Sequence, residues 1–200
     1  MNHARNAATL VALTLVASVA TQLLYFSLLS GVGIVEGWPL RSAIWSIEVI
    51  AFALMAVAAF VGLVREPRYP VVFAALGMAG IVNLAQAAIG LGGFLPAGEA
   101  GDAGGVVLSA MLGIAFLLYF LAKALIGLAG IGLGLALWQR GAGAAKLVGA
   151  AAILVGIVAT AVNGYALPTG MAHVFPAGAT GTAAALTTAL ALWLAVRLPD

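Results

Sequence analysis

The stretch that decides the fold is YFLAKALIGLAGIGLGLALWQR, residues 119–140. As an α-helix, these 22 residues cover about 33 Å, which is close to the thickness of the hydrocarbon core of a bilayer. Lys123 is the one charged side chain before the terminal Arg140. The stretch therefore predicts a transmembrane helix with a lysine inside it.

The rest of the chain has the same character. Of its 200 residues, 64% are apolar and 7% are charged, and the mean hydropathy is +1.20. A chain with so few polar residues cannot cover a water-soluble globule. The eight basic residues are scattered and form no nucleic-acid footprint. We therefore expect one multi-pass integral membrane domain over residues 1–200, with the lipid bilayer as its main partner.

Charged and Gly/Pro-rich breaks divide the chain into apolar segments of about 20 residues, the length that crosses a bilayer. An all-α bundle of six transmembrane helices follows, with spans at about 8–30, 42–64, 70–93, 116–138, 147–167 and 178–197. Residues 105–115 are also apolar, and we expect them to extend the fourth helix outward or to lie at the interface.

The basic residues set the orientation, because cytoplasmic loops carry an excess of Lys and Arg. With a cytoplasmic N-terminus, the outer segments carry only one basic residue, Arg41. The inner segments carry Arg5, Arg65, Arg68, Arg140, Lys146 and Arg197. Both termini are predicted to be cytoplasmic. A seventh helix would place Arg140 and Lys146 on the opposite side.

Two predicted hairpins, helices two and three and helices four and five, share short sequence features. GIVNLAQAAIGLGGFLPAG, residues 80–98, resembles GIVATAVNGYALPTG, residues 156–170. Glu48 and Lys123 each lie 17 residues before the arginine that follows their span. A tandem duplication of a helical hairpin is the hypothesis that these features favour.

Polar side chains inside the predicted spans lie at one depth. Counted at 1.5 Å per residue, they lie about 20 to 24 Å from the cytoplasmic edge, in the outer half of the membrane. The set is Gln22, Glu48, Asn83, Gln86, Lys123 and Asn163. These six residues are the candidate ligand-binding residues.

Glycines indicate which way these side chains face. Lys123 shares a helix face with Gly127, Gly130 and Gly134, and small residues allow membrane helices to approach closely. Because an unpaired charge inside a span costs roughly 2.5–3.5 kcal/mol, we expect Lys123 to pair with Glu48. Asn83 and Gln86 would fill the remaining hydrogen-bonding positions.

Two structural alternatives remain open for the charged residues. The pair could serve only to fix helix register, or Lys123 could extend its ammonium group to the headgroups. The single amides could equally form hydrogen bonds between helices.

The sequence gives little support for metal binding, cofactor binding or catalysis. The chain has no cysteine and only two histidines, His3 and His173, which rules out sulfur-ligated metals and a bis-histidine haem within the membrane. We therefore expect no metal and no cofactor. An enzyme acting on lipid or quinone headgroups through Lys123 or Glu48 ranks last, because adjacent opposite charges neutralise each other.

The six-span pattern, the polar NLAQAAIG of residues 83–90 and the WQRGAGAAK of residues 138–146 resemble a group of uncharacterised bacterial six-helix membrane proteins, known as a domain of unknown function. The resemblance implies a bacterial cytoplasmic membrane and no catalytic residues. The leading functional expectation is binding or transport of a small molecule at the outer-half polar site. The alternative is a structural or accessory subunit that contacts a membrane-complex partner or forms a homo-oligomer.

Overall fold

The computed structural model describes residues 2–198, apart from the side chains of residues 2 and 103. Helices are the only regular structure in this part of the chain, so the all-α expectation is confirmed. The α-helices are α1 (Asn2–Leu29), α2 (Trp38–Arg65), α3 (Pro70–Glu99), α4 (Gly101–Arg140), α5 (Ala144–Thr169) and α6 (Val174–Ala195). A short 3-10 helix, η1 (Gly170–His173), joins α5 to α6.

Five helical stretches are long and apolar enough to cross a membrane, which indicates a multi-pass integral membrane protein. Four of them correspond to α1, α2, α3 and α4. The fifth, Ala144–Ala195, is 52 residues long and contains α5, η1 and α6. The chain reverses at η1, since α5 and α6 pack against each other.

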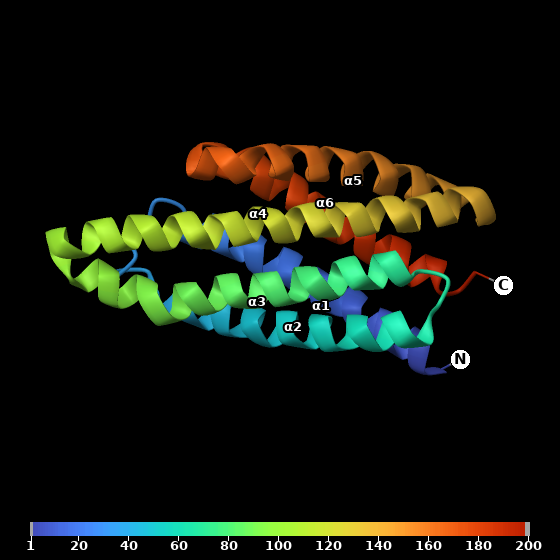
Figure 1. Ribbon diagram of the computed structural model, residues 1–200, viewed down its shortest axis with the longest axis horizontal. Helices are drawn as coiled ribbons and strands as arrows, with labels where there is room; N and C mark the ends of the chain where they lie inside the picture. Colours follow the sequence, from blue (N-terminus) through green and yellow to red (C-terminus); the bar gives the residue numbers. More distant parts are fainter. Residues whose placement is uncertain (1, 199–200) are drawn as a thin grey trace.

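The helices are longer than the predicted spans because helical hydrogen bonding continues beyond the apolar segments. Residues 105–115 belong to α4, which begins at Gly101 and has 40 residues, so the expectation that they extend the fourth helix is confirmed. At about 60 Å, α4 is roughly twice as long as a hydrocarbon core is thick. The turn between α3 and α4 lies beyond the ends of the other helices (Figure 1).

Five helices form a closed ring around the core. In order around it, α1 packs against α2, α2 against α3, α3 against α4, α4 against α6, and α6 against α1. Outside the ring, α5 covers α4 and α6 (Figure 1). Each helix of the ring therefore has a face toward one common interior.

Glycines bring α4 and α5 into backbone contact. A Cβ added to Gly156 would lie 2.6 Å from the carbonyl oxygen of Gly127, and one added to Gly134 would lie 2.6 Å from the carbonyl oxygen of Gly149. The predicted glycine stripe of α4 therefore meets helices of the same chain.

A similar contact joins α2 and α3. A Cβ added to Gly80 would lie 3.0 Å from the carbonyl oxygen of Phe52 and 2.9 Å from the amide nitrogen of Ala56. These two residues follow Glu48 by four and eight positions.

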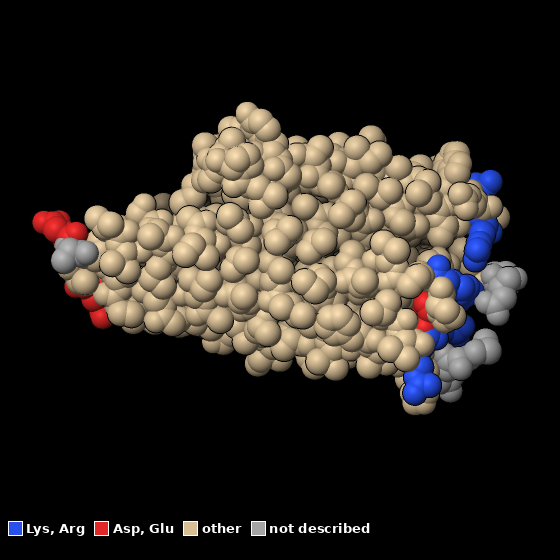
Figure 2. Space-filling model, viewed as in Figure 1, with Lys and Arg blue, Asp and Glu red and all other residues tan. Residues whose placement is uncertain are grey.

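Charged residues gather at the two ends of the molecule. On the face in Figure 2, Lys and Arg side chains lie at the end that carries both termini, and acidic side chains lie mainly at the opposite end. At the basic end, Arg68 Nε donates to Glu66 Oε1 at 2.7 Å. This hydrogen bond holds the pKa of the Glu66 carboxyl below its ordinary value.

Candidate functional site

Three layers fill the interior of the ring along its long axis. The half nearer the termini is apolar and includes Phe52, Phe73 and Ile126. The far end is aromatic, with Trp45 and Phe94 in one cluster. Between them lies a layer that contains most of the predicted polar residues, and we call it the polar layer.

Lys123 lies on α4 with its side chain in the ring interior. It is 0% exposed, and its Nζ donates to Gln22 Oε1 at 2.9 Å. Its aliphatic stem packs against Gly181 of α6, and its Nζ lies 5.1 Å from the centre of the Tyr119 ring. The expected inward orientation of Lys123 is confirmed, and extension to the headgroups is wrong.

Gln22 of α1 connects three helices of the ring. Its Oε1 accepts hydrogen bonds from Lys123 Nζ and, at 2.7 Å, from Thr182 Oγ1 of α6. Its Nε2 donates to Ser18 Oγ at 3.2 Å. One amide therefore links α1, α4 and α6 at the depth of the buried lysine.

Glu48 of α2 has a different partner on the same helix α1. Thr21 Oγ1 donates to Glu48 Oε1 at 2.7 Å, and Glu48 is 7% exposed. Neighbouring residues of a helix point about 100° apart. Thr21 and Gln22 can therefore contact α2 on one side and α4 and α6 on the other.

The direct ion pair between Glu48 and Lys123 is a sequence prediction that is wrong. Between residues 2 and 198, the one ion pair within 4.0 Å joins Glu66 and Arg68. The physical reason is that side chains of α1 take both charged groups, since Gln22 Oε1 accepts from Lys123 Nζ and Thr21 Oγ1 donates to Glu48 Oε1. The two charges interact through space, while each forms a hydrogen bond with a neutral side chain of α1.

Asn83 and Gln86 of α3 do not complete this network. Asn83 is 1% exposed, and its Nδ2 has no hydrogen-bond partner among the described residues. Gln86 is half-buried. Their expected role as partners of Glu48 and Lys123 is therefore not seen, since the lysine and the carboxylate bind to α1.

Asn163 lies outside the polar layer. Its Nδ2 donates to the carbonyl oxygens of Ala159 at 2.9 Å and of Ala177 at 3.2 Å. Since α5 lies outside the ring, Asn163 connects α5 to α6 and reaches none of the other five candidates by a hydrogen bond.

The aromatic layer covers the polar layer on the side away from the termini. Tyr25 stacks on Trp45 with ring centres 5.9 Å apart, and Phe94 lies edge-on to Trp45 at 5.5 Å. Arg41 is 5% exposed, and its guanidinium donates to the Tyr25 hydroxyl and to the Val32 carbonyl. We call Tyr25, Arg41, Trp45 and Phe94 the aromatic cover.

Sequence reasoning did not identify Thr21, Thr182 or Arg41 as parts of this region. Hydroxyl residues in helices often bond to their own backbone, as Thr187 does to Ala183, so composition does not distinguish the threonines that bridge helices. The sequence predicts Arg41 to lie in an outer loop. Two sequence features could have identified Arg41 as part of this region. It lies within the first turn of α2, and Tyr25 lies on the preceding helix.

Comparison of the chain with protein-family models, curated proteins and solved structures gives no match.

Proposed function

We propose that this protein is a six-span structural or accessory subunit of a membrane assembly, and that its polar layer locks the ring of helices. The observation that carries the proposal is the position of Gln22, whose single side-chain oxygen accepts hydrogen bonds from α4 and α6. Side-chain amides of this kind join helices within a membrane. In such a protein Lys123 and Glu48 specify which helices meet, rather than binding a solute.

Six crossings with both termini in the cytoplasm are the topology that we propose. The gathering of basic side chains at the end that carries both termini (Figure 2) supports this orientation. The reversal at η1 supports separate crossings by α5 and α6.

Cysteine labelling tests this topology, because the natural chain has no cysteine. In intact cells, a membrane-impermeant maleimide is expected to label Gly33→Cys and Ala172→Cys. Ala142→Cys and Arg197→Cys are expected to react only after permeabilisation. Labelling of Ala142→Cys and Ala172→Cys from the same side would contradict a crossing by α5.

We also propose that the hairpins α2–α3 and α4–α5 are copies of one ancestral hairpin. In α4–α5, an added Cβ at Gly156 would approach the carbonyl oxygen of Gly127 and the amide nitrogen of Ile131. These residues follow Lys123 by four and eight positions, as Phe52 and Ala56 follow Glu48. The same glycine contact therefore recurs at the same distance from each buried charge, which makes Glu48 and Lys123 equivalent positions.

The outer part of α4 supports the accessory role. Val106, Val107 and Ile114 are 80%, 53% and 56% exposed, and this part of α4 extends past α5 and α6 (Figure 1). A helix of about 60 Å exceeds the hydrocarbon thickness, so part of this apolar surface needs cover other than lipid. A partner helix or a second copy of the chain would supply it.

A second candidate function is binding or transport of a small polar molecule from the outer side. Glu48 favours it, because it is a buried residue whose carboxylate has a single neutral hydrogen-bond donor, Thr21. In that case the aromatic cover would open to admit the solute, and the present structure would be the closed state.

Mass spectrometry of the purified protein separates the two candidates. For the structural role, we expect wild type, Glu48→Gln and the control Ser46→Ala to carry the same small molecules. Ser46 lies on the same helix, exposed and two residues away. A molecule that is retained by wild type and Ser46→Ala but lost from Glu48→Gln would overturn the structural role and support solute binding.

A further inference from the structure

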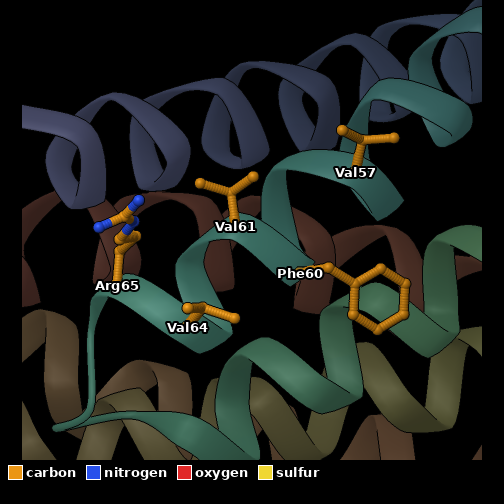
Figure 3. Close-up of a pocket in the computed structure, with 5 residues that line it drawn as sticks. All are labelled: Val57, Phe60, Val61, Val64 and Arg65. Atoms are coloured by element: carbon orange, nitrogen blue, oxygen red, sulfur yellow. The ribbon is translucent and has the colours of Figure 1, made fainter.

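A broad apolar groove lies on the exposed face of α2, in the half of the helix nearer the chain termini. Its lining residues are Val57, Phe60, Val61, Val64 and Arg65, and its volume is about 500 Å³ (Figure 3). The groove is separate from the polar layer, because Glu48 precedes Val57 on α2 by nine residues, which is more than two helical turns.

The groove has one polar end. Its four apolar residues present only carbon side chains, and Val57 and Val64 are 64% and 77% exposed. The Phe60 ring forms one wall and packs toward Gly77 of α3. Arg65, the last residue of α2, stands at the end nearer the chain termini (Figure 3).

The guanidinium of Arg65 is available to a ligand. It is exposed and forms no ion pair within the described part of the chain. Nearby Arg68, in contrast, bonds to both carboxylate oxygens of Glu66 and to the Leu198 carbonyl. The groove therefore combines an apolar floor with one uncompensated positive charge.

We propose that this groove binds an anionic phospholipid, with an acyl chain along Val57–Val64 and the phosphate on Arg65. From Val57 to Arg65 the helix rises about 12 Å, which is close to the roughly 15 Å depth of one hydrocarbon leaflet. The planar guanidinium matches the oxygens of a phosphate with two parallel hydrogen bonds. One phospholipid could therefore place its phosphate at Arg65 and extend its acyl chain to the other end of the groove at Val57.

Native mass spectrometry of the detergent-purified full chain tests the proposal. The probes are phosphatidylglycerol, phosphatidylcholine with the same acyl chains, and inorganic phosphate. Wild type is expected to bind phosphatidylglycerol about fivefold more tightly than phosphatidylcholine, the preference expected for one basic residue near an anionic lipid. Inorganic phosphate is expected not to compete, since it lacks the chain.

Three variants test separately whether Arg65 binds the phosphate and whether the apolar part of the groove binds the acyl chain. Arg65→Gln is expected to remove the preference for phosphatidylglycerol while keeping the binding of phosphatidylcholine. Val61→Trp fills the groove and is expected to weaken both lipids. The matched control Arg140→Gln removes an exposed arginine from the last position of α4 and is expected to keep the preference.

Three results would overturn the proposal. They are a preference that survives in Arg65→Gln, a loss in Arg140→Gln equal to that in Arg65→Gln, and displacement of the lipid by inorganic phosphate.

Discussion

Replacing Glu48 by glutamine or Lys123 by methionine is expected to destabilise the protein by about 3 kcal/mol each, the order of the cost of an uncompensated charge inside a span. Glu48→Gln keeps the size of the side chain and leaves the fully buried Lys123 without its nearby negative charge. Lys123→Met leaves the Glu48 carboxylate without the positive charge and Gln22 without one of its two donors. Each change leaves one charge uncompensated in an environment with little water.

Thermal unfolding of the purified variants in detergent measures these losses. The double variant Glu48→Gln, Lys123→Met removes both charges, so we expect it to lose less stability than the sum of the single losses. Gln86→Leu is the matched control, since Gln86 is half-buried and does not join the network. Losses that simply add would contradict a coupling between the two charges.

A methyl group on Gly156 is expected to cost about 1–3 kcal/mol, because it would overpack the contact between α4 and α5. The added Cβ would lie 2.6 Å from the carbonyl oxygen of Gly127 and 3.1 Å from the amide nitrogen of Ile131. Both atoms belong to the backbone of α4, so relief requires the two helices to separate rather than one side chain to turn.

Gly164→Ala on the same helix is the control for this prediction. No atom lies within 4 Å of a Cβ added at Gly164, and alanine favours a helix over glycine by about 1 kcal/mol. We therefore expect Gly164→Ala to keep or raise the midpoint of thermal unfolding and Gly156→Ala to lower it. Equal midpoints for the two variants would show that α4 and α5 do not pack through these glycines.

The sequence was sufficient for the class of fold. Hydropathy over about 20 residues locates helices, and the rise of 1.5 Å per residue converts position into height. The inward orientation of Lys123 was also predicted, although Gly127 and Gly134, which carried that prediction, pack against α5 outside the ring. These properties belong to one helix at a time.

The partners of the polar side chains could not be predicted in the same way. Equal height suggested a bond between Glu48 and Lys123, but a bond also requires that the two side chains approach within hydrogen-bond distance. The order of helices around the ring depends on the packing of many Ala and Gly residues, which resemble one another in sequence. Thr21 became the partner of Glu48 because α1 lies next to α2, and Gln22, the next residue of α1, reaches Lys123 of α4 and Thr182 of α6.

The central claim is that Glu48, Lys123 and the neutral side chains of α1 form one closed polar layer that holds the ring together. The most direct measurement is the thermal unfolding midpoint of a charge exchange, Glu48→Lys with Lys123→Glu, beside the two single substitutions. The Thr21 hydroxyl and the Gln22 amide can both donate and accept hydrogen bonds, so they can serve the exchanged charges. We expect each single substitution, which buries two like charges, to prevent stable folding, and the exchange to recover most of the lost stability. An exchanged protein no more stable than the single substitutions would contradict this claim.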